Sequence, residues 1–282
     1  MRHTAMGLER NRNERTRAVF IAATAAAMLL ATLLVAGLTG KSGLGVQLEL
    51  RNLPPSLHHP FGTDWLGRDM LVRTFKGLAL SIGIGMAGAL FSAIIATAAG
   101  LAAATLGKVA DRIITWLMDV FMSVPHLVLL ILIAFLCGGG MKGIAIGIMA
   151  THWPALARVI RAEAMSHNHS HYVAVSRKLG RSRYWIMSRH LLPGVLPQVM
   201  TGLLLLFPHA VLHEAAITFL GLGLPPSQPA IGIILSESMR YLTSGMWWLA
   251  LFPGLCLLAT VRTFDALGQS MRRLIAPGSA QL

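Results

Sequence analysis

Long apolar runs recur along this chain of 282 residues and are separated by shorter polar segments. The runs occupy residues 17–40, 77–107, 113–136, 143–159, 196–220 and 246–264. A helix of about 17–25 apolar residues crosses the hydrocarbon core of a bilayer and satisfies its own backbone hydrogen bonds there. The pattern therefore predicts an all-α polytopic membrane protein with six transmembrane helices.

The first run, after Arg17, could instead be the apolar region of a signal peptide. It holds about 20 apolar or small residues, whereas such a region has about 7–15. No cleavage motif closes it before Lys41. The sequence therefore favours a retained first transmembrane helix.

The polar segments divide the chain into four parts. Residues 1–40 form a cytoplasmic arm and the first transmembrane helix, and residues 41–76 form a polar segment on the periplasmic side. Residues 77–275 form a core of five transmembrane helices, and residues 276–282 form a tail. Within the core, residues 161–193 are too polar to span the membrane and are expected to form a long cytoplasmic loop.

The charge distribution sets the expected orientation. Charged residues make up 12% of the chain, about half the share in soluble domains. Most of the 24 basic residues lie in the N-terminal arm, around residues 108–112 and 158–189, and near the C-terminus. The positive-inside rule then places both termini in the cytoplasm. The net charge of +13 therefore requires no nucleic-acid partner.

The loop at residues 161–193 carries two helical patterns separated by a glycine. Residues 172–178 have helical character, Gly180 is a typical helix stop, and residues 182–192 form a second amphipathic stretch. This arrangement would present a docking surface to a cytosolic partner. The alternative is a solvated basic loop that lies against anionic lipid.

His209 and His213 are the main candidates for chemistry within a membrane span. Their spacing places both imidazoles on one helix face, and His209 lies roughly 20 Å along the axis at 1.5 Å per residue. Polar groups at such depth usually face a cavity or the bundle interior. Imidazole suits nickel, zinc or copper, and a histidine pair bonded to neighbouring helices is the alternative. A zinc-protease His-Glu-x-x-His motif is absent from the chain.

Other polar residues have simpler interpretations. His167, His169 and His171 alternate in the loop. They could form a metal-sensing segment, but the simpler interpretation is a polar segment that leads into a helix. The alternating charges of Asp64 and Arg68 favour an interfacial helix capped by Thr63 or Asp64 that braces the second span. Residues 225–242 are too short to span and predict a surface or re-entrant helix.

The long loop resembles a segment of a known family. Ala174-Val175-Ser176, Gly180 and Leu192-Pro193 match the spacing of the "EAA…G…LP" loop of ABC importer permeases. In that family the loop forms a coupling helix that docks into the ATPase subunit. The resemblance implies that ATPase coupling involves Tyr172, Ala174, Val175, Ser176, Gly180, Arg181, Ser182 and Arg183.

Two further stretches narrow the resemblance. The segment "GTDWLGRD" is similar to a signature of dipeptide, oligopeptide and nickel permeases, and "FLGLGLPP" at residues 219–226 is similar to the turn after their fifth span. The resemblance covers about residues 55–277. In the first stretch it assigns a periplasmic structural role to Gly62, Thr63, Asp64, Gly67, Arg68 and Asp69.

The fifth span resembles the nickel branch of these permeases. Peptide permeases lack histidines at the positions of His209 and His213, and "THW" at residues 151–153 adds His152. The resemblance therefore implies a transient metal path at these three histidines. Glu214 instead matches the peptide branch.

The implied protein is a type I ABC importer permease of a bacterial inner membrane that takes up nickel or a nickel–metallophore chelate. The alternative is a dipeptide or oligopeptide permease. The "TGKSG" segment around Lys41 lacks the first glycine of a phosphate-binding loop, because Val35 occupies that position. The chain is therefore expected to be non-catalytic and without a cofactor. Its implied partners are a second permease subunit, two ATPase subunits that use ATP, an extracytoplasmic binding protein and the bilayer.

Overall fold

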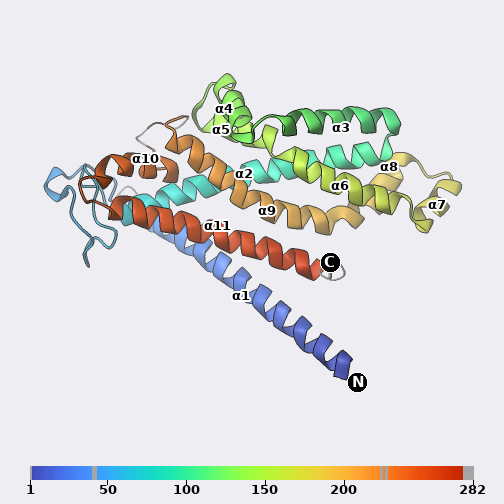
Figure 1. The fold of residues 1–282 in the computed structure, drawn as a ribbon, viewed down its shortest axis with the longest axis horizontal. Coiled ribbons are helices and arrows are strands. Elements are labelled where there is room, and N and C mark those ends of the chain that lie inside the picture. Colours follow the sequence, from blue (N-terminus) through green and yellow to red (C-terminus); the bar gives the residue numbers. More distant parts are fainter. Residues whose placement is uncertain (1, 40–42, 223–224, 226–227, 276–282) are drawn as a thin grey trace.

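The computed structural model describes residues 2–39, 43–222, 225 and 228–275, and the side chains of residues 16, 19–39 and 43–272 within these ranges (Figure 1). The predicted tail, residues 276–282, lies outside them. Every regular element of the described chain is helical, which confirms the all-α prediction. The elements are α1 (Arg2–Leu38), η1 (Leu48–Leu50), α2 (Met70–Thr105), α3 (Lys108–Ser123), α4 (His126–Leu136), α5 (Gly140–Thr151), α6 (Trp153–Asn168), α7 (His171–Lys178), α8 (Arg183–Ile186), η2 (Met187–Leu191), α9 (Leu192–Phe219), α10 (Ile231–Leu242) and α11 (Trp248–Ile275).

Five helical stretches are long and apolar enough to cross a membrane, and a bent helix pair makes a sixth. The five are Val19–Leu38, Met70–Thr105, Gly140–Asn168, Arg183–Phe219 and Trp248–Arg272. The predicted number of spans therefore holds if the bent pair counts as one. The second span starts at Met70, earlier than the predicted residue 77.

The third span differs from its prediction as a single helix over residues 113–136. It consists of α3 and α4, which meet at an angle of 99°. Val124 is extended, with φ −93° and ψ 139°, and Pro125 precedes α4. Proline disfavours the helical conformation of the residue before it and cannot donate a backbone hydrogen bond. The sequence Val-Pro therefore breaks the span.

Helices extend into the region that was predicted as a loop. The span that contains α5 and α6 continues to Asn168, beyond the predicted loop start at residue 161. The helical prediction for residues 172–178 is confirmed by α7, and Gly180 follows with φ +74°. The stretch at residues 182–192 is also helical and joins α9 through the π-turn η2.

Helix α2 is the central element and packs against α5, α6 and α9 (Figure 1). Glycines let these helices approach closely. A Cβ at Gly85 would lie 2.6 Å from Val211 Cγ2 of α9, and a Cβ at Gly88 would lie 2.4 Å from Ile148 Cγ2 of α5. Small residues serve this purpose in membrane helices generally.

The predicted cytoplasmic and periplasmic segments lie at opposite ends of the molecule. The N-terminus, the end of α11 and α7 lie toward one end in Figure 1, on the right. Residues 43–69 and α10 lie at the opposite end. Helix α10 fulfils the prediction of a short non-spanning helix within residues 225–242.

Candidate functional site

A cavity of about 600 Å³ lies where α4, α5, α6 and α9 meet, beside the break between α3 and α4. Its wall combines apolar side chains with a group of histidines. The lining residues that matter here are His126, Thr151, His152, Leu206, His209 and His213. Such a cavity inside a helical bundle is a typical place for a small ligand.

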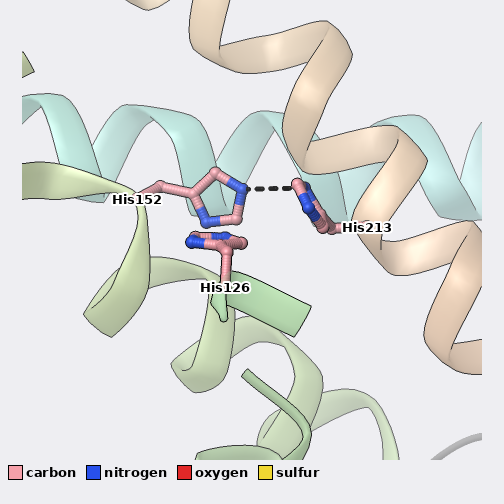
Figure 2. Close-up of side chains that lie close together, drawn as sticks. All are labelled: His126, His152 and His213. Carbon is pink, nitrogen blue, oxygen red and sulfur yellow. Dashed lines mark hydrogen bonds between the residues drawn. The ribbon is translucent and has the colours of Figure 1, made fainter. Parts of the chain in front are cut away.

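Three of these histidines form a compact cluster, shown in Figure 2. The ring centroids of His126 and His152 are 4.4 Å apart, and those of His126 and His213 are 4.6 Å apart. One ring nitrogen from each residue lies within 4.8 Å of the others. His152 Nε2 and His213 Nδ1 approach to 3.3 Å. These three residues are called the histidine cluster below.

Backbone carbonyls fix the orientation of two of the rings. His152 Nδ1 lies 3.0 Å from the Ile148 carbonyl, and His213 Nδ1 lies 2.8 Å from the His209 carbonyl. A carbonyl can only accept a hydrogen bond, so each Nδ1 must carry the proton. The Nε2 atom of each ring therefore keeps a free lone pair in the neutral state.

Breaks in the helices bring the cluster together. His126 is the first residue of α4, directly after Pro125. His152 is the joint between α5 and α6, where Pro154 occupies the first turn of the second helix. His213 lies within α9, which packs against α5 and α6.

The structure brings together two of the three histidines that the sequence singled out. His152 and His213 meet, whereas His209 is exposed and lies outside the cluster. It lines the same cavity and a second one of about 230 Å³ toward Gln198 and Thr201. His126 was missed, although the proline before it marks a break within an apolar run.

Glu214 does not join the cluster, although it follows His213. Its side chain is fully buried beside Ser81 of α2 and Thr218. Neither carboxylate oxygen makes a well-formed hydrogen bond within the described part of the chain. The cluster thus contains imidazole nitrogens and, among the described residues, no carboxylate.

The alternating histidines of the loop do not converge. His167 Nδ1 lies 3.1 Å from the Tyr172 hydroxyl, and its Nε2 lies 3.4 Å from Glu163. His169 bonds the Met165 carbonyl, and His171 starts α7. Within the described residues they form no three-ligand group.

The residues assigned to ATPase coupling divide into exposed and supporting side chains. Tyr172 and Val175 of α7 are 45% and 56% exposed, and Leu179 beyond it is 74% exposed. Val173, in contrast, is fully buried and anchors α7 to the core. The apolar outer face of α7 is therefore available to another protein. Ala174, Gly180 and Arg181 are also exposed.

The supporting residues hold the segment against the membrane helices. Ser176 Oγ lies 2.9 Å from His190 Nε2. The Arg181 guanidinium lies over the Trp185 ring at 4.8 Å, and the Ser182 hydroxyl accepts a hydrogen bond from the Trp185 amide. Arg183 donates to the Leu106 carbonyl at the turn between α2 and α3.

The "GTDWLGRD" segment forms a buried ion-pair network instead of the predicted interfacial helix. Asp64 Oδ2 accepts from Arg68 Nε at 2.6 Å and from Arg73 Nη1 at 3.0 Å. Arg73 Nη2 lies 2.6 Å from Glu237 of α10. The prediction of a helix cap at Thr63 or Asp64 was wrong, because Asp69 caps α2 by accepting from the amides of residues 71 and 72. The predicted bracing role agrees with this network.

The remaining residues of the motif shape its turns. Thr63 Oγ1 bonds the Leu53 amide and the Leu50 carbonyl. Gly62 and Gly67 have φ angles of +71° and +73°. A Cβ at Gly67 would lie 1.8 Å from the Gln47 carbonyl oxygen, so no larger residue fits there.

Comparison with known proteins gives one family and several relatives. Residues 95–277 match the family described as "Binding-protein-dependent transport system inner membrane component". A putative peptide transport system permease protein of Brucella abortus is 32% identical over 97% of this chain and 90% of its own length. The dipeptide transport system permease protein of Bacillus subtilis is 31% identical, over 82% of this chain and 72% of its own. A glutathione transport system permease protein of Pectobacterium atrosepticum is 30% identical, over 80% and 75%.

Proposed function

The chain belongs to the family of binding-protein-dependent transport system inner membrane components. From its similarity to peptide permeases we propose that it translocates small peptides or peptide-like molecules. It is a permease subunit of an ABC importer in a bacterial inner membrane. The observation that carries the proposed substrate class is the similarity to a peptide permease over 97% of the chain. The cavity of about 600 Å³ falls within the usual range for small-molecule sites, about 300–1,000 Å³.

The cavity beside the histidine cluster is the proposed part of the translocation path in this subunit. A second permease subunit would complete the path. Its cargo would arrive from an extracytoplasmic binding protein at the end that carries residues 43–69. Both termini and α7 would then face the cytoplasm, in agreement with the positive-inside rule.

Energy for transport would come from two partner ATPase subunits that bind and hydrolyse ATP. The exposed apolar face of α7 supports this assignment, because large apolar side chains gathered at one end of a molecule often mark a protein interface. When ATP closes the ATPase subunits, they would bind one of the two conformations of this chain more tightly and so shift the chain toward it. This chain would perform no covalent chemistry and would need no cofactor.

Nickel or a nickel–metallophore chelate is the second candidate cargo. The histidine cluster favours it, because three imidazole nitrogens converge on one cavity. Two of the relatives named above are named as peptide or dipeptide permeases, which favours the first candidate.

Transport by the complete importer in proteoliposomes separates the two candidates. The importer is supplied with its binding protein, ATP inside the vesicles, and either a panel of radiolabelled di- and tripeptides or radiolabelled nickel. We expect ATP-dependent accumulation of at least one peptide. Accumulation of nickel with no transport of any peptide would refute the proposed substrate class.

A matched importer with an inactive ATPase variant serves as the control. It should accumulate neither peptide nor nickel, since the permease by itself would provide no energy for uptake. Equal peptide accumulation by the control would refute the coupling assignment.

A further inference from the structure

We propose that His126, His152 and His213 form a binding site for a divalent transition-metal ion such as nickel, cobalt, zinc or copper. The proposal rests on the proposed function only in placing the site on the translocation path. The geometry itself comes from residues that lie far apart in the sequence and converge through two helix breaks.

The distances suit three nitrogen ligands on one ion. Metal–nitrogen bonds of about 2.0–2.1 Å hold ligand atoms about 3.3 Å apart in a tetrahedral site. One nitrogen from each ring already lies within 4.8 Å of the others without an ion. Rotation of the His126 ring about its broad terminal torsion, together with small shifts of the other two rings, would close the remaining gap of about 1.5 Å.

The backbone hydrogen bonds prepare two of the rings for ligation. A metal-bound histidine usually donates its other N–H to a carbonyl or carboxylate, which fixes its tautomer and orientation. His152 and His213 do this toward the carbonyls of Ile148 and His209. The Nε2 atoms of both rings thus stay unprotonated, and that of His152 lies 3.3 Å from the His213 ring. His126 Nε2 lies at a long 3.5 Å from the Thr151 hydroxyl, so its ring is weakly held and can turn toward an ion.

The alternative to a metal site is a group of histidines with a purely structural role, held together by mutual hydrogen bonds. Only one direct nitrogen–nitrogen contact of hydrogen-bond length occurs in the cluster among the described residues, between His152 and His213. The His213 proton involved is already directed at the His209 carbonyl at 2.8 Å. Mutual hydrogen bonding therefore leaves ring nitrogens without good partners, whereas an ion would engage all three.

The donor set indicates the class of metal. Nitrogen ligands favour nickel, copper, cobalt and zinc, whereas magnesium and calcium prefer oxygen ligands. The cluster includes no carboxylate within the described chain. Three protein ligands also leave coordination positions open toward the cavity, where cargo or water could bind.

Cobalt binding to the complete importer in detergent tests the site directly. Cobalt chloride is titrated into the importer, and the visible absorption of bound Co²⁺ reports its ligands. We expect one ion per copy of this chain at the cluster. His126→Gln, His152→Gln and His213→Gln should each weaken binding by at least tenfold. Unchanged affinity in all three variants would overturn the proposal.

His209→Gln is the matched control, because His209 lines the same cavity on the same helix but lies outside the cluster. It should change the affinity by less than threefold. A loss as large as that of His213→Gln would refute the assigned ligand set.

His126→Cys provides a second readout, because a thiolate ligand adds a near-ultraviolet charge-transfer band to bound Co²⁺. Absence of this band with cobalt bound would exclude position 126 as a ligand.

Two further measurements distinguish failure of the metal-site proposal from a folding defect of a variant and from failure of the proposed substrate class. Nickel should raise the thermal midpoint of the unaltered importer and leave that of His152→Gln unchanged, since only a bound ligand stabilises the native state. Peptide uptake is measured in the same preparations. Cobalt binding without uptake of any peptide would refute the substrate class and support the metal site. Peptide uptake without cobalt binding would refute the metal site alone.

Discussion

Asp64 illustrates how much a single residue can decide in this molecule. Its side chain is 3% exposed and faces the guanidinium groups of Arg68 and Arg73. Glu237 of α10 completes the network. Removal of one partner from a buried ion pair costs more than the pair itself contributes, because the other charge is left buried.

Asp64→Asn should therefore destabilise the chain by about 3 kcal/mol, since two buried guanidinium groups would share one remaining carboxylate. The measurement is thermal unfolding of the purified chain in detergent. We expect a midpoint that is lower by on the order of 5–10 °C.

Arg51→Gln is the control for that experiment, because Arg51 lies in the same segment and is exposed. It should leave the midpoint within about 1–2 °C of the original, as surface changes usually do. A similar midpoint for Asp64→Asn and Arg51→Gln would contradict a stabilising role of the network.

The histidines show where residue-level reasoning succeeds and where it ends. Spacing and depth identified His209 and His213 as groups that should face a cavity, and both line it. Only His213 joins the cluster, because His209 lies one turn away. His126 belongs to a different helix, and sequence spacing carries no information about which helices meet.

At the scale of elements, the packing of α2 depends on which face each glycine occupies. A Cβ at Gly85 would meet Val211 of α9 at 2.6 Å, whereas a Cβ at Gly83 would have no neighbour within 4 Å. Both glycines lie in the interior of the same helix, so their intrinsic helix propensity is equal.

Gly85→Ala should destabilise the chain relative to Gly83→Ala by about 2 kcal/mol, because α9 must move to accommodate the methyl group. Gly83→Ala should be neutral or slightly stabilising, since alanine is the better helix former. Chemical unfolding of both variants in the same detergent measures the difference. Equal stability of the two variants would contradict the close contact between α2 and α9 at Gly85.

Helix α7 makes a separate prediction, because its two faces have opposite roles. Val175→Asp should abolish co-purification of the ATPase subunit and reduce uptake by at least tenfold. The membrane level of the chain should stay unchanged, because Val175 is 56% exposed. Val173→Asp should lower the membrane level itself, because Val173 is fully buried.

Two results would contradict this division of α7. The first is normal ATPase binding and uptake by Val175→Asp, which would place the docking surface elsewhere. The second is a normal membrane level of Val173→Asp, which would mean that the buried face does not anchor the helix.

At the scale of the whole molecule, the arrangement of ends predicts which surfaces each compartment can reach. Cys137 is exposed beyond α4, and Cys256 is half-buried within α11. The proposed topology places Cys137 on the periplasmic side and Leu179 on the cytoplasmic side.

A membrane-impermeant maleimide should therefore label Cys137 in spheroplasts and leave Cys256 unmodified. In a Cys137→Ser background, Leu179→Cys should react in inverted membrane vesicles and not in spheroplasts. The opposite pattern at either position would overturn the proposed orientation. Detergent-solubilised protein serves as the control for reactivity of each thiol.

The sequence by itself determined the helical class, the apolar spans and the family, because lipid requires long apolar helices and short motifs survive in order along the chain. It also located α7 and the Gly180 stop, since both depend on local conformational preferences. Only the tertiary structure decided the Asp64 network and the meeting of His126 with His152 and His213. Both features join residues that are far apart in the sequence; Asp64 and Glu237, for example, belong to one network and are 173 positions apart. Such contacts depend on how the helices pack.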